Sequence, residues 1–219
     1  MVVVRQSGSN TETNFRLRLA IQKARDNNMP LENIERAVKR GSGETEGATL
    51  AEMVLEGYGP GGAAILVQAL TDNRNRTLQD IRNIFSRHNG SLGENGCVAW
   101  LFDPTGLITV PINDLDAEEL ELKAIDAGAE DVKVENDYLE IYTKPEDMEK
   151  TRAAMEQQRL TIASSELIMT SKNMVELEEN SALQTLKLLD KLEELDEVQH
   201  VTSNADFPEN ILEKYQSHA

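Results

Sequence analysis

The chain has 219 residues, of which 39% are hydrophobic and 28% are charged, and its formal net charge is −17. This composition predicts a globular protein of one to three domains. No run of residues approaches the roughly 20 apolar positions of a membrane span, and the first residues lack the pattern of a signal peptide. We therefore expect a cytoplasmic protein with no membrane partner. The single cysteine, Cys97, excludes an internal disulfide and is expected in the core.

Charge is distributed unevenly along the chain. Residues 1–92 contain 12 Lys and Arg against 10 Asp and Glu, whereas residues 93–219 contain 10 against 29. Ten of the first 12 cations are arginines, which suit bidentate phosphate contacts. The acidic second part would repel a polyanion but could present a surface to a basic protein. The sequence therefore predicts that only the first part faces phosphate.

The first 47 residues are predicted to form a helical domain with a linker at its end. Apolar residues recur at helical spacing between Asn14 and Gly41, and Asn27–Pro30 interrupts them, so we expect a hairpin of two helices. Two helices alone bury little surface, and we therefore expect that this domain continues upstream of the first residue.

The cations of the predicted hairpin have two interpretations. In the first helix, Arg16 with Lys23 and Arg18 with Arg25 are seven residues apart, so each pair lies on one side of the helix and could bind phosphates. In the second helix, Glu32 precedes Arg36 and Glu35 precedes Lys39 by four residues. That spacing is typical of surface ion pairs, which is the interpretation we favour there.

A second domain is predicted at 48–112 and 173–207, with 113–172 inserted into it and a tail at 208–219. The first part of the second domain is predicted to contain strands 53–58 and 63–70, a helix around 78–85, and strands 97–102 and 107–110 joined by a turn at 103–106. The insertion is predicted as helix 117–126, strand 132–135, a turn at 136–137, strand 139–143, helix 145–157 and strand 161–169. A helix around 183–192 and a strand at 198–202 should return to cover the second domain.

Two glycine- or arginine-containing segments are candidate anion sites. Gly57–Gly62 resembles a phosphate loop, but it lies between two strands and Pro60 removes a backbone N–H, so a structural turn is favoured. Arg74 and Arg76 stand where a strand leads into a helix, and positive charge is unfavourable at a helix start. Either an anion binds there or acidic neighbours such as Asp72 and Asp80 neutralise the two arginines, and the sequence leaves both open.

Catalytic patterns are weak. The three histidines, His88, His200 and His218, have no zinc-ligand spacing and no thiol partner. Acidic pairs such as Glu193-Glu194 are typical of a solvated helix face. We predict no catalytic residue, no metal and no cofactor, although an enzyme that uses carboxylates stays open.

Three segments carry a resemblance to a known family: Asn33–Gly41, Glu56–Gly62 and Thr71–Thr77, supported by Arg16–Ile21 and Trp100-Leu101-Phe102. With them the chain resembles the YebC family over nearly its whole length. The resemblance implies an α+β fold with three domains: a helical N-terminal domain and two ferredoxin-like α/β domains, the third inserted in the second. It also implies that a strongly basic helical segment normally precedes the first residue of this chain.

The resemblance implies a non-enzymatic regulator of gene expression, described for the family as a DNA-binding transcriptional regulator. The alternative within the family is a ribosome-associated translational activator that relieves stalling on proline-rich stretches. We expect a monomer that contacts DNA or ribosomal RNA. The candidate contacts are cations of the first 92 residues: Arg16, Arg18, Lys23, Arg25, Arg74, Arg76 and Arg82. A protein-binding adaptor and a small-molecule enzyme remain as alternatives from other functional classes.

Overall fold

The computed structural model describes residues 1–43, 50–112, 116–135, 137–208, 211–212 and 215. It is a mixed α+β protein in which the chain divides into two compact units. The first unit contains residues 1–47 and 104–168, and the second contains residues 48–103 and 169–219. Two of the crossings between the units, at 103–104 and at 168–169, lie within strands.

Three helices form the N-terminal part of the first unit: α1 (Val2–Ser7), α2 (Phe15–Asp26) and α3 (Leu31–Gly41). Val4, Leu17 and Ile34 are buried among them. The hairpin of α2 and α3 is the one predicted from the apolar stripes. It turns at Asn28, whose φ of 56° lies in the left-handed region that asparagine tolerates, and α3 follows Pro30 directly.

The rest of the first unit is a four-stranded antiparallel sheet with two helices on one face. The strands lie in the order β5-β6-β4-β7, and their bounds are β5 (Asp131–Glu135), β6 (Tyr138–Thr143), β4 (Phe102–Pro111) and β7 (Ser164–Ser171). Helices α5 (Ala117–Ala127) and α6 (Met148–Gln157) cover the face that carries Ile108, Leu139 and Ile141. Leu19 of α2 belongs to the same buried cluster, so the helical segment and this sheet share apolar surface.

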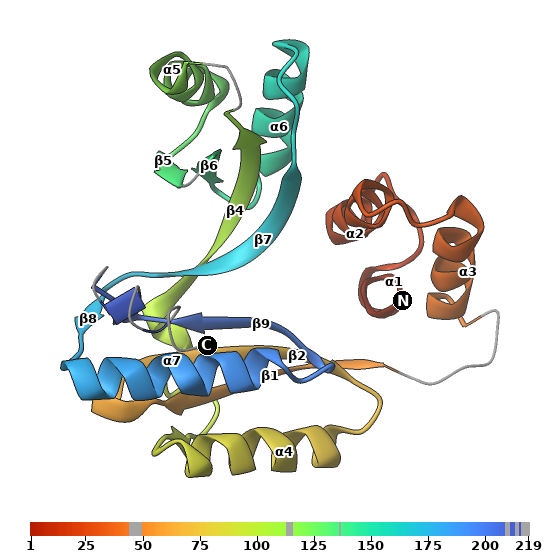
Figure 1. Ribbon diagram of the computed structural model, residues 1–219. Coiled ribbons are helices and arrows are strands. Elements are labelled where there is room, and N and C mark those ends of the chain that lie inside the picture. The colour runs from red at the N-terminus through yellow and green to blue at the C-terminus, as the bar shows by residue number, and fades with distance from the viewer. Residues whose placement is uncertain (44–49, 113–115, 136, 209–210, 213–214, 216–219) are drawn as a thin grey trace. The chain divides into compact units, whose positions relative to one another are not determined.

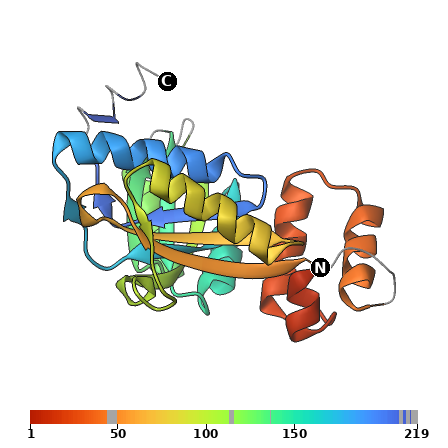
Figure 2. The same ribbon diagram turned by 90° about the horizontal axis from the view of Figure 1, so that it is seen from below.

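The second unit has its own four-stranded sheet in the order β3-β1-β2-β9. Its strands are β1 (Ala51–Tyr58), β2 (Ala64–Thr71), β3 (Ser91–Leu92) and β9 (Val198–Ser203). Helices α4 (Arg74–Arg87) and α7 (Glu179–Glu193) lie beside each other on one face of it (Figures 1 and 2). Apolar residues of both helices, such as Phe85 and Leu188, pack on Ile65 and Val67 of the central strand.

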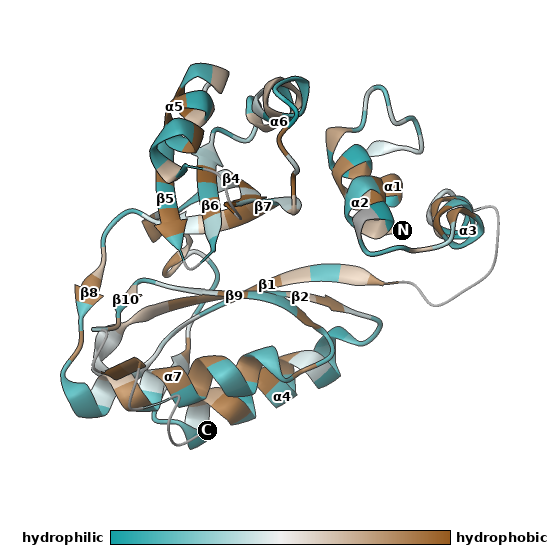
Figure 3. Cartoon of the chain, turned by 45° about the horizontal axis from the view of Figure 1, so that its top comes forward, coloured by the Kyte–Doolittle hydropathy of each residue, from teal (hydrophilic) through white to brown (hydrophobic). Residues whose placement is uncertain are grey.

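Figure 3 shows the alternation of apolar and polar residues along α7, which is typical of a helix with one buried face. The leucines predicted for this helix are Leu183, Leu186, Leu189 and Leu192. Leu186 and Leu192 are buried and the other two are partly buried, while Leu188, which the prediction did not include, is also buried. A second small sheet pairs β8 (Val175–Glu176) in parallel with β10 (Ala205–Asp206). Of the predicted tail, Ile211 and Tyr215 pack beside α7, and much of the remainder lies outside the described residues.

Two predictions between residues 97 and 106 are wrong. The segment predicted as strand 97–102 contains a short 3-10 helix, η2 (Ala99–Leu101), because the Glu56 carboxylate binds the N–H groups of Gly96, Val98 and Ala99 and curls the backbone around it. The predicted turn at 103–106 lies inside the continuous strand β4.

Strand β4 also changes the boundary of the predicted insertion, which was placed at 113–172. Residues 106–111 pair with β6 in antiparallel register, so the strand before Ile112 belongs to the sheet of residues 104–168. Pro104 and Gly106 suggested a turn, but the hydrogen bonds of the neighbouring strand keep this segment extended. Asn136, half of the predicted turn at 136–137, and residues 44–47 of the predicted linker lie outside the described residues.

Candidate nucleic-acid interface

Two of the α2 candidates, Arg16 and Lys23, are engaged with polar side chains. Arg16 donates from Nη1 to Oε1 of Gln6 on α1 at 2.9 Å. Lys23 Nζ lies 2.6 Å from Oε2 of Glu166 on β7. Both cations are exposed, so these contacts are surface interactions that contribute little to stability.

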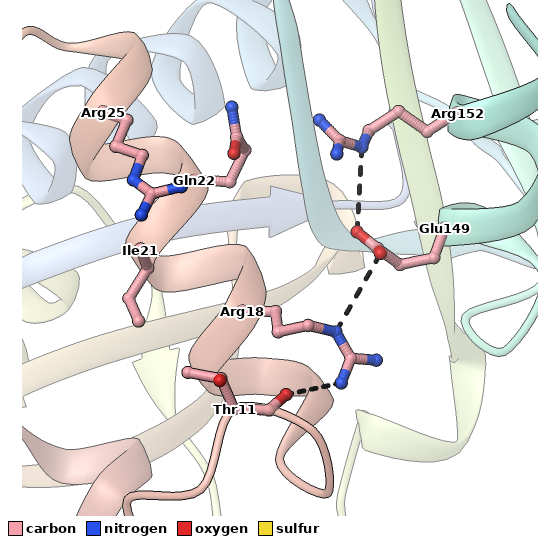
Figure 4. Close-up of a pocket in the computed structure, with 7 residues that line it drawn as sticks. All are labelled: Thr11, Arg18, Ile21, Gln22, Arg25, Glu149 and Arg152. Carbon is pink, nitrogen blue, oxygen red and sulfur yellow. Dashed lines mark hydrogen bonds and ion pairs between the residues drawn. The ribbon is translucent and has the colours of Figure 1, made fainter. Parts of the chain in front are cut away.

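The other two α2 candidates, Arg18 and Arg25, line a pocket of about 240 Å³ together with Arg152 of α6 (Figure 4). Arg18 donates from Nη1 to the carbonyl oxygens of Thr11 at 2.6 Å and Glu12 at 3.0 Å. Arg18 Nε lies 3.9 Å from Oε2 of Glu149. The other carboxylate oxygen of Glu149, Oε1, lies 3.7 Å from Arg152 Nε. The structure therefore brings together two predicted cations and one that the sequence had not indicated.

Helix α3 carries three further cations that sequence reasoning did not select. Arg36, Lys39 and Arg40 are exposed on the side of α3 opposite the buried Ile34. The predicted ion pairs of Arg36 and Lys39 with Glu32 and Glu35 do not form among the described residues. Lys39 and Arg40 follow Arg36 by three and four residues, which places all three cations on one face of a helix. This spacing is the feature of the sequence that could have identified them.

The arginines of α4 differ from one another although they are close in sequence. Arg76 lies 3.0 Å from Asp72 Oδ1 and 2.8 Å from Glu197 Oε1. The hydrogen bond that Arg76 donates to Glu197, followed by the charge of Asp72, raises the pKa of Arg76. Acidic neighbours thus neutralise Arg76, and this was one of the two alternatives that the sequence left open. These neighbours are Asp72 and Glu197, and Asp80 forms no ion pair with Arg76.

Arg74 and Arg82 are exposed on α4, and neither forms an ion pair with any residue that the structure describes. Arg74 is the first residue of the helix. Asn73 caps that end by accepting a hydrogen bond from Arg76 N at 3.2 Å, and the first turn contains no acidic residue. The positive end of the helix dipole therefore adds to the positive charge of Arg74.

The glycine-rich segment is a structural turn. Residues Pro60–Gly62 form a 3-10 turn, η1, between β1 and β2, and φ of Gly61 is 74°, a value that favours glycine. Thr185 of α7 donates to the carbonyl oxygen of Pro60 at 3.3 Å. In the described part of the chain, no helix is long and apolar enough to cross a membrane, and no group of three His, Cys, Asp or Glu could hold a metal ion.

Two family profiles match the chain. The profile described as "TACO1/YebC protein N-terminal domain" matches residues 1–44, and "TACO1/YebC second and third domain" matches residues 50–205. The chain belongs to the TACO1/YebC family. Helices α2 and α3 fall within the N-terminal domain of this family, and α4 falls within its second and third domains.

Similar TACO1/YebC proteins include one from Dehalococcoides mccartyi that is 59% identical over 98% of this chain and 86% of its own length. Another, from Chloroflexus aggregans, is 48% identical over 99% of this chain and 87% of its own length. Both are named "Probable transcriptional regulatory protein".

The crystal structure of a conserved hypothetical protein from Aquifex aeolicus has the same fold. It superposes with a TM-score of 0.88 at 45% identity and covers 96% of this chain and 87% of that one. The α+β architecture that the sequence predicted is therefore confirmed for this TACO1/YebC chain.

Proposed function

We propose that this TACO1/YebC protein is a non-enzymatic regulator of gene expression that binds nucleic acid, with DNA as the leading target. The names of its relatives support a role in transcription. The concentration of arginine in the first 92 residues supports a phosphate-facing surface, because cations that neutralise phosphates release counterions and so favour binding.

The observation that carries this proposal is the pair Arg74 and Arg82. Both guanidinium groups are exposed, and no described carboxylate neutralises either of them. Arg74 also lies at a helix N-terminus, where backbone N–H groups and the helix dipole favour an anion. We propose Arg74 and Arg82 as phosphate contacts in the second unit, together with Arg36, Lys39 and Arg40 of α3 in the first.

The acidic part of the chain has a separate role in this proposal. Residues 93–219 carry 29 Asp and Glu against 10 Lys and Arg, so they repel nucleic acid and limit binding to the cationic helices. The same carboxylates suit a basic protein partner, for example within a transcription or translation complex.

The experiment is a salt titration of duplex DNA binding with the full chain. Replacing Arg74 and Arg82 by alanine removes two phosphate contacts, so we expect weaker binding and a plot of log K against log salt that is shallower by about 2. The matched control replaces Lys150 and Lys187, which are exposed cations of the acidic part, and should leave the slope unchanged. Equal slopes for the two double variants would reject the proposed contacts.

Two further arms of this titration address the alternatives. Arg76→Ala should leave the salt slope close to that of the wild-type protein, because Asp72 and Glu197 already neutralise this arginine. Ribosomes and duplex DNA are titrated in parallel. Salt-dependent binding to ribosomes alone would move the target to ribosomal RNA, and salt-independent binding to both would favour a protein-binding adaptor.

A further inference from the structure

We propose that the pocket between α2 and α6 binds a phosphate monoester, in which the phosphate is attached to one substituent only. Arg18, Gln22 and Arg25 line it from α2, and Glu149 and Arg152 line it from α6 (Figure 4). This inference goes beyond the proposed function, because the ligand is a single terminal phosphate group and not the backbone of a nucleic acid.

The charges that line the pocket match such a ligand. Three guanidinium groups and one carboxylate, that of Glu149, line the pocket, which leaves an excess of two positive charges among its lining residues. A phosphate monoester carries about −1.5 to −2 at pH 7, whereas a phosphodiester carries only one negative charge. Glu156 also pairs with Arg152, at 3.2 Å from Nη1, but it does not line the pocket.

Arg18 is held in place by the segment that precedes α2. Two backbone carbonyl oxygens, of Thr11 and Glu12, accept hydrogen bonds from Nη1 of Arg18. This leaves the rest of its guanidinium group available to an anion, and orientation by the protein reduces the entropy lost on binding. The pocket thus has a preorganised cation on the α2 side.

Arg152 supplies an unsatisfied donor on the α6 side. Its side chain is only 17% exposed, and its Nε is buried without a hydrogen-bond partner among the described residues. The ion pair of this atom with Glu149 is too long for a hydrogen bond. A buried donor without a partner is costly, and an anionic oxygen would satisfy it.

Arg25 is the third cation and the most adaptable. It is exposed on α2 beside Gln22, and it forms no ion pair within the described ranges. The volume of about 240 Å³ exceeds that of one phosphate group. It therefore leaves space for the group to which the phosphate is attached, such as a sugar.

Isothermal titration of the full chain with inorganic phosphate and with adenosine 5′-monophosphate tests the proposal. We expect both to bind at pH 7.5, adenosine and dimethyl phosphate to bind at least ten-fold more weakly, and affinity to fall at pH 5.5, where the second phosphate proton returns. Equal affinity for adenosine and its monophosphate would overturn the inference.

Three variants separate a ligand site from a purely structural ion network. Arg25→Gln should weaken phosphate binding at least ten-fold, and Glu149→Gln should strengthen it, because it removes a negative charge from the pocket. Lys150→Gln, a neighbouring cation of α6 that does not line the pocket, should change nothing. If Glu149→Gln weakens binding as Arg25→Gln does, the network is structural and the proposal fails.

The source of the phosphate is distinguished with oligonucleotides of one sequence. If the ligand is a nucleic-acid end, a 5′-phosphorylated strand binds more tightly than its 5′-hydroxyl counterpart and adenosine 5′-monophosphate competes. If the ligand is a small metabolite, the two strands bind equally and only the free monophosphate responds to Arg25→Gln. Duplex DNA binding that persists while neither phosphate ligand binds would reject this inference and leave the proposed function intact.

Discussion

Glu56 shows how one side chain can decide the path of a loop. Only 3% of this residue is exposed. Its carboxylate accepts hydrogen bonds from the backbone N–H groups of Gly96 at 2.6 Å and of Val98 and Ala99 at 2.8 Å. Burial raises the pKa of Glu56, but the three hydrogen bonds outweigh it, so the pKa lies below its ordinary value. The ionised carboxylate is therefore part of the fold.

We expect Glu56→Gln to destabilise the second unit by about 2–4 kcal/mol, because an amide nitrogen cannot accept the hydrogen bonds that it replaces. Urea unfolding followed by circular dichroism measures this loss. Glu94→Gln, an exposed change in the same loop, is the control and should remain within about 0.5 kcal/mol of wild type.

The pH dependence follows from the direction of the shift. A lowered pKa in the folded state means that Glu56 stabilises the protein above the ordinary glutamate pKa of about 4.3, and that this contribution is lost as the pH falls through its folded pKa. Glu56→Gln should therefore lose less stability than wild type on acidification from about pH 5. Parallel acid curves for the two proteins would contradict the assignment.

Two arginines with the same local sequence pattern also have different ion-pair partners. Arg74 and Arg76 stand two positions apart at the start of one helix, yet only Arg76 reaches Asp72 and Glu197. Glu197 lies 121 positions further along the chain. Local pattern could raise the possibility of neutralisation but could not say which arginine is neutralised.

At the scale of elements, Asn14 joins α1 to α2. It is buried, its Oδ1 accepts Leu17 N at 3.0 Å as the N-cap of α2, and its Nδ2 donates to the carbonyl oxygens of Val3 at 3.1 Å and Gly8 at 2.7 Å. One side chain thus caps the start of α2 and satisfies one carbonyl of α1 and the carbonyl of Gly8, the residue that follows α1. A short helix such as α1 depends on such tertiary contacts.

We expect Asn14→Ala to destabilise the helical segment by about 2–3 kcal/mol, from the lost cap and the two unsatisfied carbonyl groups. Hydrogen exchange should then rise in α1 and the first turn of α2 before it rises in the sheets. Asn33→Ala, on the exposed side of α3, is the control. Unchanged exchange in α1 after Asn14→Ala would show that apolar packing alone holds these helices together.

At the scale of the whole molecule, the chain leaves the second unit within β4 and returns to it within β7. Lys172 N donates to the carbonyl oxygen of Leu101 at 2.9 Å, and Thr170 Oγ1 donates to that of Asp103 at 3.4 Å. The exit and return points are therefore adjacent, which is the geometry that an inserted domain requires. Both sheets also have separate buried clusters.

We expect that joining Asp103 to Met169 through a few Gly and Ser residues leaves the second unit folded, because α4, α7 and β9 keep their core. Circular dichroism and amide exchange are the appropriate measurements, since Trp100 is 65% exposed and reports burial poorly. A cooperative transition with protected amides in α7 supports an insertion. A molten product would mean that residues 104–168 are needed for the second unit to fold.

Much of the fold was determined by the sequence itself. The apolar residues at helical spacing in α2, α3, α4 and α7 and the short apolar runs of β1, β2, β6 and β9 placed these elements correctly, because each depends on residues close in the chain. The uneven charge also directed attention to the cationic helices. Cys97, expected in the core, is instead only half-buried at the edge of the cluster around Phe102.

Tertiary structure alone decided the rest. The pattern of residues 97–102 predicts a strand, but the segment bends because Glu56 of β1 accepts hydrogen bonds from its backbone. Strand β4 continues through Pro104 and Gly106 because it pairs with neighbouring strands. Arg152 lines the same pocket as Arg18 and Arg25 only because the fold places α6 beside α2. These features depend on groups from 27 to 134 positions apart, and periodicity within one element contains no information about such partners.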